Sequence, residues 1–202
     1  MSTDPIHVAL LLAAGASRRL GRPKQLEIVD GESLIRRMAR VALATHPRQL
    51  YVALGAEIPG CTEVLAGLPC EILVCPDWQR GMGATLAQAA RAIDEPGAGL
   101  LVLGVDQPHL DAAHLNRLIE QWRRDPQSPV ASAYAGTLGT PVLLPAHWRE
   151  RLLALDGDHG ARWLLRASGE RVHTIHAPQL ALDLDDAQDF ASMQPPIPGG
   201  PR

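Results

Sequence analysis

The sequence predicts a three-layer α/β sandwich with a mostly parallel central sheet, and three observations lead to this fold class. The chain has 202 residues, enough for one domain with a substantial buried core. Its short apolar runs lack strict alternation of polar and apolar residues, as expected of strands that are buried on both faces. Segments with helical spacing separate these runs, and strands that alternate with helices form right-handed βαβ units.

The strands are predicted from the apolar runs alone. The first run is IHVALLLA, and a later one, LLVLGV, leads directly into an aspartate. In chain order, the strands are expected at residues 6–13, 50–54, 71–75, 100–105, 129–134 and 141–145.

The helices are predicted from apolar residues that recur at helical spacing, as Leu34 and Met38 do in the first of them. Asp111 is expected to cap the third helix and Asp158 the fourth. Gly169 is expected to end the fourth helix in a left-handed conformation. The helices are placed at residues 32–44, 82–93, 111–124 and 158–168.

The bulk composition indicates a globular protein, and the lack of a membrane span and of a signal peptide leads us to expect it in the cytoplasm. Hydrophobic residues make up 46% of the chain and charged residues 20%, the usual balance of such a protein. The net charge of −3 gives no general attraction to nucleic acid or to anionic membranes, so neither is expected as a partner. No apolar run is long enough to span a membrane, and residues 1–12 lack the features of a signal peptide.

Residues 1–190 are expected to form a single domain, and residues 191–202 a disordered tail. Most of the tail is the segment MQPPIPGGPR, residues 193–202, which is rich in proline and glycine and poor in apolar residues. The cysteines are odd in number and lack metal-ligand spacing, so they are expected to be reduced structural residues. They are Cys61, Cys70 and Cys75.

The loops that follow the strands are the places to look for a ligand, because ligands of such sheets bind beyond the carboxyl ends of the strands. These loops follow Leu12, Cys75 and Val105. The first lies in LLAAGASRRLGRPKQL, residues 11–26, and holds the only lysine of the chain, Lys24. Its small residues let a ligand approach main-chain N–H groups, which together form an anion nest.

The residues of this first loop predict a site for phosphate groups. Arg19 offers a bidentate guanidinium, Lys24 a compact positive charge and Ser17 a hydroxyl. The spacing from Gly15 to Gly21 does not fit the P-loop motif. The dinucleotide pattern GxGxxG is also absent, which disfavours an oxidoreductase. A solvated surface turn is the alternative, since the chain is generally rich in arginine.

The stretch LAAGASRRLGRPKQL resembles the L-A-A-G-x-S-x-R-[MF]-G-x-x-K signature of the nucleotidyltransferases that include the molybdenum cofactor cytidylyltransferases and guanylyltransferases. The resemblance implies a Rossmann-like nucleotidyltransferase fold. Leu20 stands where methionine or phenylalanine is more usual. The resemblance further implies that Arg19 and Lys24 are catalytic. The implied nucleotide-binding residues of this loop are Ala13, Ala14, Gly15, Ala16 and Ser17.

Two further loops resemble motifs of the same family. PDWQRGMGATL resembles G-M-G-[SA]-S-L, whose small residues line the nucleotide pocket, although a plain glycine-flanked helix entry is the alternative. LLVLGVDQPHL resembles G-x-D-[QM]-P, whose aspartate is a metal ligand. A carboxylate at the end of a central strand is well placed to hold Mg²⁺ against a triphosphate, so Asp106 is predicted to be catalytic and to bind Mg²⁺, with a turn aspartate as the alternative. The nucleotide-binding residues predicted in the second loop are Gly81, Met82, Gly83 and Thr85.

The carboxyl-terminal third resembles further segments of the family. GTLGTPVLLP is expected to pass the acceptor side of the cleft, with Thr140 where histidine or asparagine is common. In LDGDHGARWLL, Arg162 is a candidate to reach an acceptor phosphate. In LALDLDDAQDF, Asp183 and Asp185 alternate along an expected strand and so point to opposite faces. By motif position, Asp185 is favoured as the second metal ligand, with Asp183 as the alternative.

The resemblance implies transfer of CMP from CTP to the terminal phosphate of molybdopterin, with release of pyrophosphate and Mg²⁺ as cofactor. The acceptor phosphate is already anionic, so the reaction needs positioning and charge neutralisation rather than a general base. Ala14, where the guanylyl branch tends to have glycine, favours CTP by narrowing the base pocket. The alternatives are use of GTP, another small phosphorylated acceptor, or a non-catalytic nucleotide-binding chaperone of a molybdoenzyme. Transient contact with a molybdoenzyme is a further expectation.

Overall fold

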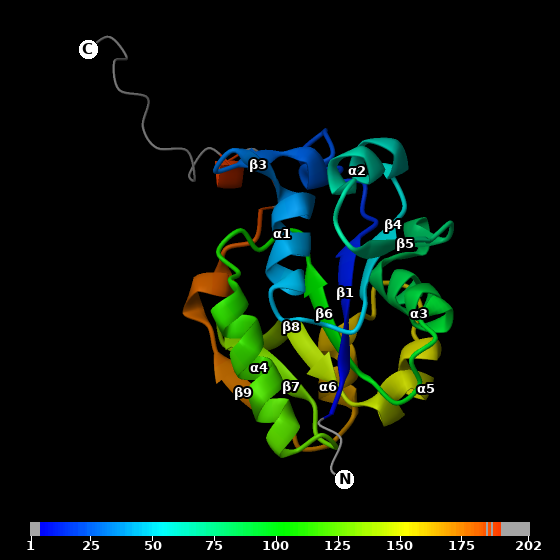
Figure 1. Cartoon of the computed structure of the whole chain (residues 1–202), viewed down its shortest axis with the longest axis vertical. Helices are drawn as coiled ribbons and strands as arrows, with labels where there is room; N and C mark the ends of the chain where they lie inside the picture. Colours follow the sequence, from blue (N-terminus) through cyan, green and yellow to red (C-terminus); the bar gives the residue numbers. More distant parts are fainter. Residues whose placement is uncertain (1–4, 185, 187, 191–202) are drawn as a thin grey trace, which may run out of the picture.

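A seven-stranded sheet forms the centre of the computed structural model, which describes residues 5–184, 186 and 188–190. The strand order is β5-β4-β1-β6-β8-β7-β9. Strand β8 pairs antiparallel with both of its neighbours, and all the other pairs are parallel. Helices cover both faces of the sheet (Figure 1). The predicted fold class, a three-layer α/β/α sandwich with a mostly parallel sheet, is confirmed.

The predicted strands are all present, and all but the last lie within one residue of their expected ends. The last begins four residues early, at Thr137, because the polar segment before it pairs with β7 in a hairpin. The strands predicted from the sequence are β1 (His7–Ala13), β4 (Leu50–Leu54), β5 (Cys70–Val74), β6 (Gly99–Gly104), β7 (Val130–Tyr134) and β8 (Thr137–Leu144).

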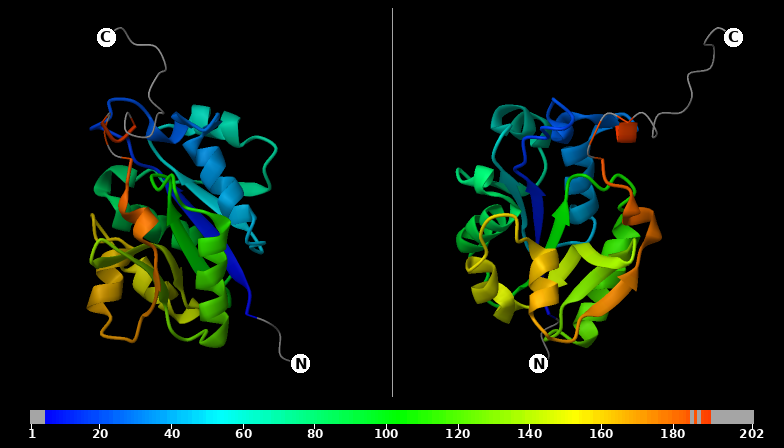
Figure 2. Two further views of the ribbon diagram at one scale, coloured as in Figure 1. Left: turned by 90° about the vertical axis from the view of Figure 1, so that its left-hand side faces the viewer. Right: turned by 180° about the vertical axis from the view of Figure 1, so that it is seen from behind.

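Two apolar layers hold the helices against the sheet. Leu10 and Leu11 are neighbours in β1 that face opposite layers, and neither is accessible to solvent. This burial on both faces explains the absence of polar alternation. One face carries α1 (Leu34–Leu43), α2 (Ile58–Leu65) and α4 (Ala112–Arg124), and the other carries α3 (Met82–Ala92), α5 (Arg149–Leu153) and α6 (Ala161–Ala167). Figure 1 shows α1 and α4 in front of the sheet. The right-hand view of Figure 2, seen from behind, shows α6 in front of the opposite face.

Several elements were not predicted, each for a local reason. Strand β9 (His173–His176) lies at the sheet edge, and its residues are half-buried or exposed, so it has no apolar run. Strands β2 (Ile28–Val29) and β3 (Glu32–Ser33) have only two residues each. Helix α2 contains Pro and Gly in its first turn, a combination that is more typical of a loop. Helix α5 is a short continuation of a 3₁₀ turn.

Of the three helix-end residues predicted from the sequence, two are confirmed and one is wrong. Asp158 does not cap the fourth predicted helix, because α6 begins at Ala161 with Gly160 as its N-cap and no side-chain cap. The residues before it instead form a turn that crosses over the start of α3. Asp111 does cap α4, accepting the N–H of His114 at 2.7 Å. Gly169 adopts the expected left-handed conformation, with φ of +65°.

The prediction of a strand around Asp183 is wrong, because residues 182–184 pair with no strand. The N–H of Leu184 instead donates to the main-chain oxygen of Asp106 at 2.9 Å, which draws this segment to the end of β6. Asp185 and the predicted tail at residues 191–202 lie outside the described residues.

The cysteines are free thiols, as predicted. Burial raises the pKa of the Cys61 thiol to about 11, so this group remains protonated at neutral pH. Within the described ranges, no helix has the length and apolarity to cross a bilayer.

Candidate active site

A cleft of about 580 Å³ opens where the carboxyl ends of β1 and β6 meet the first turn of α3. This is the edge at which the parallel strands end, and the loops after β1, β5 and β6 converge there. The predicted site residues of these loops line the cleft together, with the exception of Gly83. The lining residues are Leu12, Ala13, Ala14, Gly15, Ala16, Ser17, Arg18, Arg19, Lys24, Gln25, Trp78, Gln79, Gly81, Met82, Thr85, Val105, Asp106 and Asp158.

The first loop joins β1 to a short 3₁₀ helix, η1 (Lys24–Leu26), and is closed by its own hydrogen bonds. Ser17 adopts a positive φ of +51°, and its carbonyl accepts the N–H groups of Leu20 and Gly21 at 3.0 and 3.1 Å. The Ser17 hydroxyl accepts the N–H of Lys24 at 3.0 Å. This hydroxyl, predicted as a phosphate donor, therefore serves to fold the loop back on itself and to place Lys24.

Gln25 is a residue of this loop to which the sequence assigned no role. Its side chain is 1% exposed. Its amide nitrogen donates to the carbonyls of Ala13 and Gly15 at 2.8 and 2.6 Å, and its amide oxygen accepts the Ser17 hydroxyl at 3.4 Å. Because these carbonyls are held inward, the loop is fixed in one conformation at the cleft.

Replacing Gln25 with leucine is expected to weaken nucleotide binding and to lower the free energy of unfolding by about 1–3 kcal/mol, because buried carbonyls lose their donor. Gln25→Glu is expected to be equally harmful, since a carboxylate there faces the same carbonyl oxygens. Denaturant unfolding and titration with nucleoside triphosphates measure the two effects. Gln127→Leu, at an exposed position, is the control. Wild-type affinity in Gln25→Leu contradicts the assignment.

Lys24 and Asp106 bring the first and third loops together. The Lys24 ammonium Nζ lies 3.5 Å from the Asp106 carboxylate Oδ2. The Lys24 side chain is 13% exposed and that of Asp106 is 34% exposed, so this pair is only partly accessible to solvent. Arg18 and Arg19 add exposed guanidinium groups to the same wall. The cleft therefore combines several cations with the carboxylates of Asp106 and Asp158, the charges needed to hold a metal-bound polyphosphate.

The position of Asp106 is set by its neighbours. A Cβ at Gly104 would lie 2.6 Å from Asp106 Oδ1, so a glycine there leaves the space that the carboxylate occupies. The next residue, Gln107, is 1% exposed. Its amide nitrogen donates to the Tyr134 hydroxyl at 3.1 Å and to the Thr140 carbonyl at 3.0 Å. These bonds fasten the Asp106 loop to β7 and β8.

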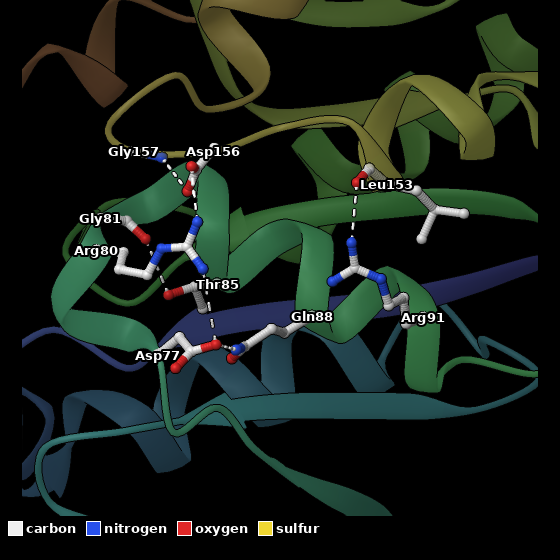
Figure 3. A network of polar contacts seen from close by, with 9 residues as sticks. All are labelled: Asp77, Arg80, Gly81, Thr85, Gln88, Arg91, Leu153, Asp156 and Gly157. Carbon is white, nitrogen blue, oxygen red and sulfur yellow. Dashed lines mark hydrogen bonds and ion pairs between the residues drawn. The ribbon is translucent and has the colours of Figure 1, made fainter.

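The second loop lies beneath the turn that precedes α6. The N–H of Gly83 donates to the Gly157 carbonyl at 2.7 Å. The guanidinium of Arg80 lies 2.7 Å from the Asp156 carboxylate and 3.9 Å from that of Asp77, which Figure 3 shows as a bridge between the two segments. Gly83 thus allows the start of α3 and the turn before α6 to approach each other closely, and it does not line the cleft.

The substitution Gly83→Ala is expected to lower the free energy of unfolding by about 1–3 kcal/mol, because overpacking strains a well-packed site. An added Cβ would lie 2.7, 2.8 and 2.9 Å from the carbonyl oxygens of His159, Asp156 and Gly157. Gly97→Ala is the matched control, since no atom lies within 4 Å of its Cβ position and its φ lies outside the left-handed region. Thermal unfolding of both variants gives the comparison. Equal stability of the two variants contradicts this role of Gly83.

Some cleft residues were not predicted from the sequence. Trp78 lines the cleft, and its ring occupies the space beside Gly55, where no Cβ fits. Asp158 was assigned to a helix cap but faces the cleft instead. Gln79 also lines the cleft. Trp78 and Gln79 stand just before the glycines of the second loop, and that proximity was the signal available for them.

Two residues expected on the acceptor side lie near the same edge of the sheet. A Cβ at Gly139 would lie 3.1 Å from Nη2 of Arg162, so this guanidinium rests against β8. Thr140 presents its carbonyl to both Gln107 and Tyr134 at 3.0 Å. Its side chain forms no part of the cleft lining.

A model of the MobA-like NTP transferase domain matches residues 9–173. The chain belongs to this family. In this MobA-like NTP transferase, the matched region begins within β1 and ends at the first residue of β9, so it includes all three loops of the cleft. The resemblance to nucleotidyltransferases that the loop motifs indicated is confirmed at the level of the family.

Curated relatives of this MobA-like NTP transferase match most of its length. The purine catabolism protein PucB of Bacillus subtilis (strain 168) is 27% identical over 193 residues, which is 91% of this chain and 92% of PucB. Nicotine blue oxidoreductase of Paenarthrobacter nicotinovorans is 32% identical over 171 residues, 80% of this chain and 82% of that protein.

Solved structures share the fold of this MobA-like NTP transferase. Rv0371c of Mycobacterium tuberculosis H37Rv superposes with a TM-score of 0.84 at 27% identity, over 95% of this chain and 98% of that one. A structure of the same mycobacterial protein in complex with manganese superposes with a TM-score of 0.77 at 24% identity, over 93% and 97% of the two chains.

Proposed function

We propose that this NTP transferase moves CMP from CTP to the terminal phosphate of molybdopterin and releases pyrophosphate. The observation that carries the proposal is the meeting of Lys24 and Asp106 in a cleft lined by the small residues of the first loop. An acceptor phosphate oxygen attacks the α-phosphorus of CTP, and the bond to the bridging oxygen of pyrophosphate breaks. No proton needs to be removed from the nucleophile, so no general base is required.

The cleft residues predicted from the sequence are each given a place in the proposed reaction. Main-chain N–H groups of residues 13–17, together with Arg19 and Lys24, hold the β- and γ-phosphates and stabilise the departing pyrophosphate. Gly81, Met82 and Thr85 border the ribose and base. Thr85 donates its hydroxyl to the Gly81 carbonyl at 3.2 Å, which fixes the first turn of α3 beside the nucleotide.

The residues of the cleft fit one Mg²⁺. Among the described residues no three His, Cys, Asp or Glu side chains converge on a metal position. Mg²⁺ bound to a nucleotide needs only one or two carboxylates, because substrate phosphates and waters complete its octahedron. Asp106 is the carboxylate proposed to hold it, with Asp185 as a second ligand. The metal supplies a positive charge that neutralises the phosphates during transfer.

The proposed preference for CTP over GTP rests on one residue of the cleft lining, which directly follows β1. Ala14 lines the cleft and is 5% exposed, so its methyl group occupies space that a glycine would leave open. A narrower pocket favours a pyrimidine over a purine. This residue is therefore the proposed source of selectivity for CTP over GTP.

A competition assay tests the proposed reaction. Purified protein is mixed with molybdopterin, Mg²⁺ and CTP, GTP or ATP, and pyrophosphate and the dinucleotide product are measured. We expect product with CTP and much less with GTP. Preference for GTP contradicts the cytidylyl assignment. Pyrophosphate release with another phosphorylated acceptor and none with molybdopterin indicates a different acceptor.

A second candidate function follows from the relative named nicotine blue oxidoreductase, at 32% identity. In that case the cleft binds the diphosphate of NADH or NADPH, and a hydride passes to an oxidised organic dye. The absence of a GxGxxG motif weighs against this function. Loss of NADH absorbance with such a dye, and no nucleotidyl transfer, favours it.

A non-catalytic chaperone of a molybdoenzyme requires that Asp106→Ala leave the activity of that enzyme in cells unchanged.

A further inference from the structure

Asp158 lines the cleft but has no part in the reaction described above. Its side chain is exposed. It caps neither of the two helices beside it, because α6 has Gly160 and α3 has Gly81 as N-cap. Within the described part of the chain, no hydrogen bond or ion pair reaches the Asp158 carboxylate, whereas that of the neighbouring Asp156 pairs with Arg80. Asp158 is therefore a carboxylate that is open to a ligand.

The turn that carries Asp158 is held against the start of α3. The N–H of Gly83 donates to the carbonyl of Gly157 at 2.7 Å, and Figure 3 shows Gly157 beside the first turn of that helix. A Cβ at Gly81 would collide with Oδ1 of Asp158, so this carboxylate lies directly against the residue that precedes α3. The ribose and base are proposed to lie at the same residue. Asp158 is therefore fixed on the nucleoside side of the cleft.

The wall formed by the first loop has the opposite character. The carbonyls of Ala13 and Gly15 are already bound by the buried amide of Gln25, so they are occupied as acceptors. The same loop brings three cations to the cleft, namely Arg18, Arg19 and Lys24. This wall therefore offers mainly hydrogen-bond donors and positive charge, which suit the phosphates of a nucleotide.

The chemistry of a nucleoside triphosphate decides which part of it an open carboxylate can bind. An ionised carboxylate only accepts hydrogen bonds, and the ionised phosphates also only accept them. Two such groups repel each other because their charges are alike. The hydrogen-bond donors of CTP are all in its nucleoside, where they are the ribose hydroxyls and the 4-amino group of cytosine. Asp158 is thus complementary to the nucleoside and not to the phosphates.

We propose that Asp158 accepts a hydrogen bond from a donor of the nucleoside and so selects the triphosphate by its base or its sugar. The 4-amino group and the ribose hydroxyls share the required chemistry. A contact with the amino group also disfavours UTP, because UTP carries an acceptor oxygen at that position and the carboxylate would repel it. The inference rests on the proposed function for the presence of a nucleoside triphosphate in the cleft, and it does not depend on the identity of the acceptor.

Equilibrium titrations of the full chain with Mg²⁺ and CTP, without any acceptor, test the proposal. Asp158→Ala is expected to raise the dissociation constant of CTP about tenfold, because a hydrogen bond to a charged group is lost. Its affinity for magnesium pyrophosphate, which has no nucleoside, is expected not to weaken. Asp94→Ala is the control, since this exposed carboxylate follows α3 at the end away from the cleft. An unchanged affinity for CTP in Asp158→Ala overturns the proposal. An equal loss of affinity for pyrophosphate also overturns it, because Asp158 would then act on the metal or the phosphates.

Analogues of CTP identify the donor. UTP lacks the amino group, and 2′-deoxy-CTP and 3′-deoxy-CTP each lack one hydroxyl. The wild type is expected to bind the analogue without the contacted donor more weakly than CTP, and Asp158→Ala is expected to narrow that difference. Narrowing with UTP assigns the contact to the base, and narrowing with a deoxy analogue assigns it to the ribose. If Asp158→Ala weakens CTP and all three analogues by the same factor, no nucleoside donor is involved and the proposal fails.

Failure of the inference differs from failure of the proposed function. If the wild type transfers no CMP to molybdopterin but its CTP affinity depends on Asp158 as expected, the proposed acceptor is wrong and the inference stands. If CMP is transferred and Asp158→Ala binds CTP as the wild type does, only the inference fails. Should Asp158→Ala unfold at a lower temperature than the wild type, Asp158→Asn keeps the size of the side chain and removes its charge. The same narrowing in that variant supports the inference, and unchanged discrimination between CTP and every analogue overturns it.

Discussion

The substitution Asp106→Asn is expected to lower kcat for nucleotidyl transfer by about a hundredfold or more, the scale of removing one electrostatic contact to the transition state. An asparagine side chain keeps the shape of the aspartate but carries no charge, so the metal would lose its carboxylate ligand. The Asp106 carboxylate also lies 3.5 Å from the Lys24 ammonium, and its loss alters the charge around that group. Steady-state assays over a range of Mg²⁺ concentrations measure the effect.

A matched substitution separates this effect from a general change of charge. Asp94→Asn removes an exposed carboxylate after α3, at the opposite end of that helix from the cleft, and is expected to leave the rate unchanged. Asp106→Asn should fold normally, because its main-chain bond from Leu184 does not depend on the side chain. A normal rate in Asp106→Asn contradicts a metal-binding role. The role is also contradicted if raised Mg²⁺ restores neither the kcat nor the KM of this variant, even in part.

The fold was predictable because its central strands are buried on both sides. The consecutive apolar residues of β1 are a direct consequence of that burial, and the sequence alone places this strand to within one residue. Strand β9 was not predictable in this way, because an edge strand with half-exposed residues carries no such run. The start of β8, which lies inside the sheet, was missed because Thr137, Leu138 and Thr140 are only half-buried and two of them are polar.

The sequence could predict candidate residues of the cleft only in the loops and first helical turns that follow the strands. Lys24 and Asp106 follow β1 and β6, and the topology brings them together. Gln25 and Asp158 depend instead on contacts between segments distant in the chain, such as the bonds of Gln25 to the main chain of β1 and its loop. Gly83 was predicted to line the nucleotide pocket, but in the structure it allows two main chains to pack closely. The sequence alone does not distinguish a glycine needed for such packing from one that admits a ligand.

The only lysine of the chain is the subject of the second prediction. Lys24 lies in a partly buried position with its compact ammonium beside the Asp106 carboxylate, in the cleft proposed to bind the phosphates. A guanidinium is broader and planar, so Lys24→Arg keeps the charge but displaces it. We expect kcat/KM for CTP to fall at least about tenfold, which corresponds to about 1.4 kcal/mol in the transition state.

Arg22→Lys is the natural control for this substitution, because it exchanges the same two residue types in the same loop. The Arg22 guanidinium is exposed and pairs with the Glu27 carboxylate, with Nη2 to Oε2 at 2.9 Å, and it takes no part in the cleft lining. Its replacement is expected to leave the rate unchanged. Parallel kinetics of the two variants decide the matter: a large loss in Lys24→Arg alone shows that the position needs an ammonium. Equal tolerance of both shows that the lone lysine reflects only the composition of an arginine-rich chain.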